Sequence, residues 1–162
     1  MTELEMKKYS RNALLGSFVS MLTAGLATMM YSVSISTIRT DLALTAVQAG
    51  SLGTYTFMGQ MLGGMVAGYL ADRYGRKNIL IVDVILATLA VFATSLLQSY
   101  SIFGILRFIT GVGLGGCYYI ASILIGEFVP TNKRGFMSGV ATSVWNFGYV
   151  VCCAMSAFAL PS

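Results

Sequence analysis

The pattern of apolar and polar positions divides the chain into five long apolar stretches joined by short polar connections. The stretches cover about residues 12–38, 48–70, 78–97, 102–126 and 136–160. Each reaches the roughly 20 residues that an α-helix needs to cross the hydrocarbon core of a bilayer. Thr45 and Gln48 have the spacing of a capping box, which predicts the start of the second helix. The pattern therefore predicts an all-α, polytopic membrane protein with five transmembrane helices.

Composition strengthens this interpretation. Of the 162 residues, 56% are hydrophobic and 10% are charged, whereas soluble domains contain roughly 25% charged residues. The net charge is +4, but the cations gather in short clusters between the apolar stretches, a pattern that does not favour nucleic-acid binding. The three cysteines lack a C-x-x-C spacing and there is no histidine, so we expect no metal site, disulfide framework or cofactor. We expect one membrane domain over residues 1–162 and no enzymatic activity.

Helical spacing assigns different faces to the first three stretches. The first has a small and polar face, predicted to meet another helix or a cavity, made of Ser17, Ser20, Ala24, Thr28 and Tyr31. The second carries two Gly-x-x-x-Gly pairs that predict close helix packing, Gly59 with Gly63 and Gly64 with Gly68. The third is apolar on all sides and is predicted to face lipid. Its one charge, Asp83, lies early in the stretch, where the positive helix end and nearby cations can stabilise it.

The short connections differ in charge. One side of the membrane collects eight cations, Lys7, Lys8, Arg11, Arg73, Arg76, Lys77, Lys133 and Arg134, and the loops of the other side hold only Arg39. Cytoplasmic loops carry the excess of Lys and Arg. We therefore expect a multi-pass protein of the plasma membrane with a cytoplasmic N-terminus.

The connection around residues 68–80 contains two residues that topology alone does not explain. Asp72 lies just past the end of the second helix, where the helix dipole disfavours an anion. Either the neighbouring arginines or the positive end of a helix outside these 162 residues must stabilise it. Gly75 suits a left-handed turn position, and Arg76 can reach carboxylates.

This connection resembles the signature loop of the major facilitator superfamily, G-x-x-x-D-R-x-G-R-K/R. The matching residues are Gly68, Asp72, Arg73, Gly75, Arg76 and Lys77. Arg107 with Gly111 resembles the R-x-x-x-G of that family's fourth helix, and Glu127 with Arg134 resembles the E-x6-R of its sugar-porter-like and aromatic-acid-symporter-like members. The resemblance implies the N-terminal part of a six-helix half, with a second half to complete the carrier. It implies that Asp72, Arg76, Glu127 and Arg134 form a cytoplasmic gate, and that a small organic solute is transported by alternating access.

Further polar residues are candidates for a substrate cavity or for coupling. Arg107 either faces a polar interior or snorkels to the membrane surface. Tyr118 shares its face, and Trp145, Asn146 and Tyr149 of the fifth stretch contact either substrate or another helix. Gly111 to Gly116 match G-x-G-x-x-G, but without a preceding strand we assign them to helix packing.

The mode of transport has several alternatives. The fifth stretch lacks the proline of the drug-antiporter motif, so symport or uniport is favoured over a multidrug-type proton antiporter. Protons are candidate co-substrates, although the first stretch contains no membrane carboxylate. A membrane sensor or assembly subunit without transport activity is the alternative from another class.

Overall fold

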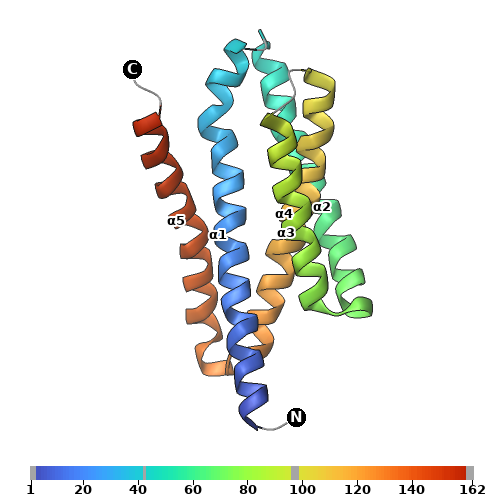
Figure 1. Cartoon of the computed structure of the whole chain (residues 1–162), viewed down its shortest axis with the longest axis vertical. Helices are drawn as coiled ribbons and strands as arrows, with labels where there is room; N and C mark the ends of the chain where they lie inside the picture. The colour runs from blue at the N-terminus through green and yellow to red at the C-terminus, as the bar shows by residue number, and fades with distance from the viewer. Residues whose placement is uncertain (1–2, 42, 96–98, 160–162) are drawn as a thin grey trace.

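The computed structural model describes residues 3–41, 43–95 and 99–159. These form five long helices, α1 (Glu3–Asp41), α2 (Ala46–Tyr74), α3 (Arg76–Ser95), α4 (Tyr100–Phe128) and α5 (Arg134–Ala159), with a short 3₁₀ turn, η1 (Thr131–Lys133), before α5. Successive long helices run in opposite directions (Figure 1). The N-terminus and the α2–α3 and α4–α5 connections therefore lie at one end of the molecule, and the α1–α2 connection lies at the other. The predicted all-α fold is confirmed.

The helices coincide with the five apolar stretches and extend beyond most of their predicted limits. The predicted ends at residues 97 and 160 lie outside the described residues. The capping box at the start of α2 is confirmed: the backbone N–H of Gln48 donates to Thr45 Oγ1 (3.3 Å), and the backbone N–H of Thr45 donates to Gln48 Oε1 (2.9 Å).

Four segments of the described helices are long and apolar enough to cross a membrane. They are Leu14–Ser32, Arg76–Thr94, Tyr100–Phe128 and Thr131–Met155. Helix α2 is as long as α4 but is not among them, because its glycines, its hydroxyl groups and Gln60 lower its mean hydropathy. That α2 also crosses the membrane stays a prediction.

Helix α4 is the centre of the packing. It makes the most extensive contacts with α2 and α3 and also contacts α1, while α5 packs mainly against α1 (Figure 1). The α2–α4 contact is built on glycine, as predicted: a Cβ atom on Gly63 would overlap the backbone of Val112, and one on Gly111 would overlap the backbone of Thr56. Backbone approaches of this kind are the usual packing device of helices in lipid.

The predicted polar face of α1 is also packed. Ser17, Ser20 and Ala24 are buried, and the hydroxyl of Ser20 donates to the backbone carbonyl of Ser17 (2.9 Å). A Cβ atom on Gly25 would overlap the backbone of Trp145, so α5 lies close against this part of α1.

The prediction that α3 faces lipid does not hold for one of its faces. Leu80, Asp83, Ala87 and Ala90 are buried and recur at helical spacing on one face, which packs against α4. Asp83 was predicted to be stabilised by the positive end of its helix. It lies instead in the eighth position of α3, beyond the first turn where the dipole acts, and only 7% of it is exposed.

Candidate functional site

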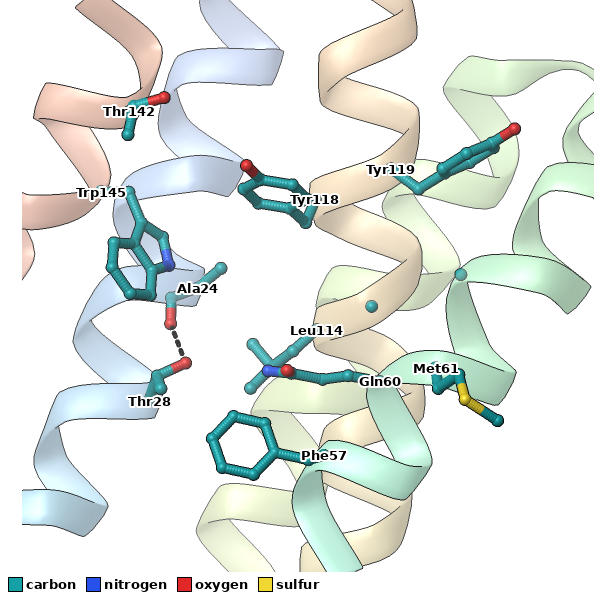
Figure 2. Close-up of a pocket in the computed structure, with 12 residues that line it drawn as sticks. Ala24, Thr28, Phe57, Gln60, Met61, Leu114, Tyr118, Tyr119, Thr142 and Trp145 are labelled. Atoms are coloured by element: carbon teal, nitrogen blue, oxygen red, sulfur yellow. Dashed lines mark hydrogen bonds between the residues drawn. The ribbon is translucent and has the colours of Figure 1, made fainter. Parts of the chain in front are cut away.

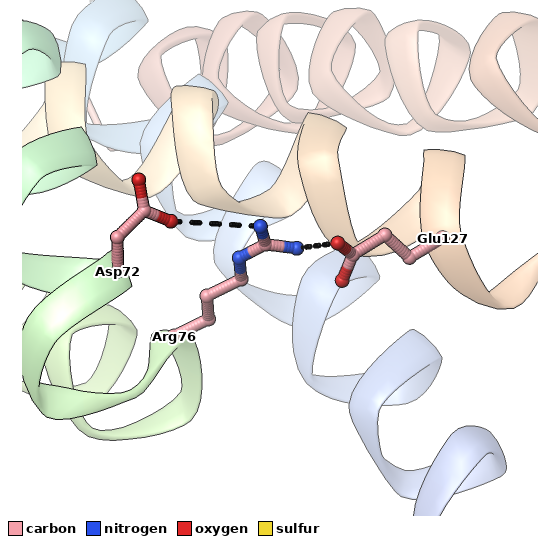
Figure 3. Close-up of polar contacts among 3 residues, drawn as sticks. All are labelled: Asp72, Arg76 and Glu127. Carbon is pink, nitrogen blue, oxygen red and sulfur yellow. Dashed lines mark ion pairs between the residues drawn. The ribbon is translucent and has the colours of Figure 1, made fainter.

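Arg76 joins the two charged connections at the end of the molecule that carries the N-terminus (Figure 3). Its Nη2 atom lies 3.6 Å from Oδ1 of Asp72, and its Nη1 atom contacts Oε1 of Glu127. Asp72 is in the last turn of α2, Arg76 is the first residue of α3, and Glu127 is in the last turn of α4. We call these three residues the Arg76 bridge. It ties together the ends of three helices.

The bridge explains the position of Asp72. The negative end of the α2 dipole disfavours a carboxylate, and the guanidinium of Arg76 one turn later compensates for it. Of the two sources of stabilisation considered above, the neighbouring arginine is therefore present. Arg76 contacts one oxygen on each of two carboxylates, so it links two helix ends rather than binding one carboxylate with both arms.

Gly75 makes the single-residue turn that places Arg76. Its φ is +89° and its ψ is 132°, a conformation that is strained for a residue with a side chain. Its N–H donates to the carbonyl of Ala71 (3.0 Å) and ends α2, and α3 begins at the next residue. Gly68 serves packing instead, since a Cβ atom there would lie 2.8 Å from the ring of Tyr119.

The other cations of the two connections lie outside the bridge. Arg73 lies over the ring of Tyr74, with its Cζ atom 5.8 Å from the ring centroid. Lys77 is exposed. Arg134 donates its Nε–H to the carbonyl of Val129 (3.0 Å) and so closes its own loop. Among the described residues, ion pairs join only the members of the Arg76 bridge.

A cavity of about 610 Å³ lies between α1, α2, α4 and α5 (Figure 2). Aromatic side chains form much of its wall, and three residues supply polar groups. The aromatic residues are Phe57, Tyr118, Tyr119 and Trp145, and the polar ones are Thr28, Gln60 and Thr142. An apolar cavity with a few convergent polar groups is typical of a small-molecule site.

Of the five predicted cavity residues, Tyr118 and Trp145 line this cavity, and Asn146, Tyr149 and Arg107 do not. Tyr118 and Trp145 point into it from opposite sides (Figure 2). Asn146 is exposed and donates its Nδ2–H to the carbonyl of Thr142 (2.9 Å), because one residue after Trp145 the helix has turned away. Tyr149 is 46% exposed one turn further along α5, beyond the cavity wall.

Arg107 faces the interior and does not snorkel. Only 7% of it is exposed, and its guanidinium lies 4.1 Å from the ring centroid of Tyr31 and 5.2 Å from that of Phe103. The hydroxyl of Tyr31 donates to the carbonyl of Ala49 (2.9 Å), so the cluster connects α1, α2 and α4. No described residue accepts a hydrogen bond from Arg107 Nε. Neither residue lines the cavity: Tyr31 lies about one turn beyond Thr28 on α1, and Arg107 lies about two turns from Leu114 on α4.

Several residues of the site were not singled out from the sequence. Apart from Gln48 of the capping box, Gln60 is the only amide side chain in the second stretch. An amide within an apolar stretch could have indicated a polar site. Phe57 carried no signal, because an aromatic residue in an apolar stretch is ordinary. Asp83 was noticed, but its burial was not predicted.

Together, the fold and the site define a multi-pass helical membrane protein with a largely apolar, aromatic cavity between its helices. The family model described as Major Facilitator Superfamily matches residues 17–161. The chain therefore belongs to the Major Facilitator Superfamily.

Three relatives indicate the breadth of the family. The chain is 33% identical to the cis,cis-muconate transport protein of Acinetobacter baylyi, over 92% of this chain and 36% of that protein. It is 33% identical to the niacin transporter NiaP of the same organism, over 78% of this chain and 29% of that protein. It is 32% identical to synaptic vesicle glycoprotein 2A of Rattus norvegicus, over 75% of this chain and 16% of that protein. The chain thus spans about a third or less of these relatives.

Proposed function

We propose that this chain is the N-terminal part of a carrier that moves a small organic carboxylate across the plasma membrane by alternating access, as a symporter or uniporter. The cavity between α1, α2, α4 and α5 is the observation that supports this most directly. Its aromatic wall suits a planar apolar body, and its hydroxyl and amide groups suit polar substituents. The two relatives named for muconate and niacin favour a carboxylate, since both of those solutes carry that group.

Arg107 supplies the charge that such a solute requires. It is a buried cation that lies beyond the cavity wall and is covered by the ring of Tyr31. A guanidinium binds a carboxylate through two parallel hydrogen bonds. A rotation of Tyr31 would expose Arg107 to a solute in the cavity, and its unpartnered Nε–H is consistent with a group that awaits an acceptor.

The Arg76 bridge acts as part of a cytoplasmic gate. It holds the ends of α2, α3 and α4 together at the end of the molecule where the cations gather, which the distribution of Lys and Arg assigns to the cytoplasm. Opening the cavity to that side requires these helix ends to separate. The remaining residues of the predicted gate support these connections without forming ion pairs among the described residues. They are Gly68, Arg73, Gly75, Lys77 and Arg134.

Tryptophan fluorescence tests solute binding in the chain itself. Trp145 is the only tryptophan and lines the cavity, so its emission reports on that site without a label. We expect a saturable change of emission with small aromatic or unsaturated carboxylates, and none with sugars or organic cations. Trp145→Phe should abolish the signal. A panel that produces no saturable change with any carboxylate contradicts the proposal.

Arg107→Ala tests the role of the cation in the same titration. Truncating one partner of a buried charge pair costs roughly 2–5 kcal/mol, so affinity for a carboxylate should fall at least tenfold. Affinity for the matching amide, which carries no charge, should change little. Arg39→Ala is the control, because Arg39 is an exposed arginine at the same end of the molecule. Equal losses for acid and amide would show that Arg107 only shapes the cavity.

A further inference from the structure

Asp83 is a buried carboxyl group in α3 that does not line the cavity. Only 7% of the residue is exposed, and its Oδ2 atom has no hydrogen-bond partner among the described residues. It lies on the packed face of α3 between Leu80 and Ala87. Because the described helices that pack against α3 already bury it this far, contact with a further helix would only increase its burial. A buried carboxyl oxygen without a donor requires an explanation.

The groups of α4 that face Asp83 leave space for a carboxyl group but provide no cation. Gly116 lies directly against Oδ2, so that a Cβ atom there would overlap it, and Gly113 lies against the backbone carbonyl of Asp83. Cys117 follows Gly116 on the buried side of α4 and is the titratable group of that helix beside Asp83. A thiol does not neutralise a carboxylate.

Helices α1 and α2 also provide no cation. Helix α2 contributes Ala67, and α1 presents the hydroxyls of Ser20 and Thr23 to a cavity of about 150 Å³ that it shares with α3 and α4. On α3 itself, Arg76 and Lys77 are the nearest charges in sequence. They lie at the start of the helix, roughly 10 Å away along its axis.

A proton is the ligand that these surroundings fit. An ionised carboxylate without a cation or a hydrogen-bond donor is strongly disfavoured in an apolar interior. A metal ion would need several oxygen ligands, and the described residues contain no group of three His, Cys, Asp or Glu side chains that could hold one. Addition of one proton from water converts the carboxylate to a neutral acid and removes the charge.

We propose that Asp83 is a proton-binding site whose occupancy controls the packing of α3 on α4. The neutral acid allows α3 to lie against Gly113 and Gly116 as observed. The ionised form requires water, which can reach it only when the two helices separate at these glycines. Since α3 begins at Arg76, the same helix connects the proton site to the Arg76 bridge. The coupling of protonation to transport rests on the proposed function, whereas the proton site itself does not.

Infrared spectroscopy of the whole chain in lipid nanodiscs tests the proton site. We expect a carboxylic-acid C=O band at neutral pH that is lost in Asp83→Asn and retained in Asp72→Asn. Absence of this band from the unmodified chain, or its persistence in Asp83→Asn, overturns the proposal.

Asp83→Glu decides the question if Asp83→Asn does not fold, as judged by its helical circular dichroism. Glutamic acid keeps the titratable group but moves it by one methylene, so the band should shift in frequency. A band at unchanged frequency would belong to another residue and would also overturn the proposal.

Vesicles containing the full-length carrier test the coupling. The Asp83→Asn side chain is neutral and cannot ionise, so it mimics the protonated acid at every pH. Proton-driven accumulation of solute should therefore be lost, while exchange of solute across the membrane is kept. Undiminished proton-driven accumulation in this variant overturns the coupling. The proton site and the proposed function can be rejected separately. A carboxylic-acid band without solute binding near Trp145 supports the proton site and contradicts the proposed function. Solute binding without that band rejects the proton site alone.

Discussion

At the level of single residues, the ion pairs of the Arg76 bridge are weak, although they join the ends of three helices. All three of its side chains are reached by water, with 27% of the Arg76 side chain exposed, 49% of Glu127 and 73% of Asp72. Exposed ion pairs of this kind contribute about 0–1 kcal/mol each. The bridge can therefore open at a small cost in free energy, as the proposed gating role requires.

Replacing Glu127 with Gln is expected to impair turnover of the full-length carrier without unfolding it. The change removes the ion pair with Arg76, which contributes about 1 kcal/mol or less to stability at this exposure. Uptake into vesicles measures turnover, and the midpoint of thermal unfolding measures stability. Lys133→Gln is the matched control, because Lys133 is exposed at the same end of the molecule and is not in the described ion pairs. Normal uptake by the Glu127→Gln variant would contradict the proposed gating role of the Arg76 bridge.

The sequence predicted the unusual residues of this connection better than their partners. Asp72 conflicts with the dipole of its own helix, and Gly75 follows the last turn of that helix, so both could be recognised from local physics. That Arg76 divides its contacts between Asp72 and Glu127 depends on the distance between α2 and α4, which no local pattern contains. Arg134 matched a motif, yet it donates to the carbonyl of Val129.

At the level of helices, α3 shows why the side that faces other helices is hard to predict in a membrane protein. Its buried face carries the small residues Ala87 and Ala90, while large residues such as Leu89 and Phe92 are more than 60% exposed. Lipid is as apolar as leucine, so no hydrophobic effect draws large side chains inward, and small residues pack best against a neighbouring helix. Periodicity and caps therefore predict where such a helix begins and ends but not which side packs.

The glycines of α2 give a test of helix packing. Gly63→Ala should destabilise the fold by about 1–3 kcal/mol, because the new Cβ atom would overlap the backbone of Val112, which cannot move independently. Gly50→Ala in the same helix is the control. No neighbour lies within 4 Å of its Cβ position, and alanine is the better helix former by up to about 1 kcal/mol.

Unfolding in detergent, followed by circular dichroism, measures both variants. Similar midpoints for Gly63→Ala and Gly50→Ala would mean that α2 and α4 are further apart than described.

At the level of the whole molecule, the cavity depends on the convergence of four helices that are distant in sequence. Trp145 and Tyr118 could be predicted as cavity residues from the sequence of their own helices, because the N–H of Trp and the O–H of Tyr need a hydrogen-bond partner within the membrane. Thr28 and Gln60 join them only through the packing of α1 and α2 around α4. The sequence therefore predicted the kind of protein and the number of long helices, and it predicted the composition of the site only in part.

Labelling of single cysteines tests the orientation of the whole molecule. In a background with Cys117, Cys152 and Cys153 replaced by Ala, Val47→Cys places an exposed thiol at the start of α2, and Lys77→Cys places one in the first turn of α3, at the other end of the molecule. A membrane-impermeant maleimide should label position 47 in intact cells and position 77 only after permeabilisation, because the cation-rich end is expected in the cytoplasm. The reverse pattern would invert the assignment of the gate.

The single-residue turn at Gly75 also sets the mechanics of the bundle. One residue spans about 3.8 Å between neighbouring Cα atoms, so the connection has almost no slack. Helices α2 and α3 cannot slide lengthwise past each other, and their ends can part only by swivelling about the backbone bonds of Gly75. The movement of α3 proposed at Asp83 would therefore reach α2 as a rotation. Inserting residues after Gly75 should uncouple the motions of the two helices while leaving both helices intact.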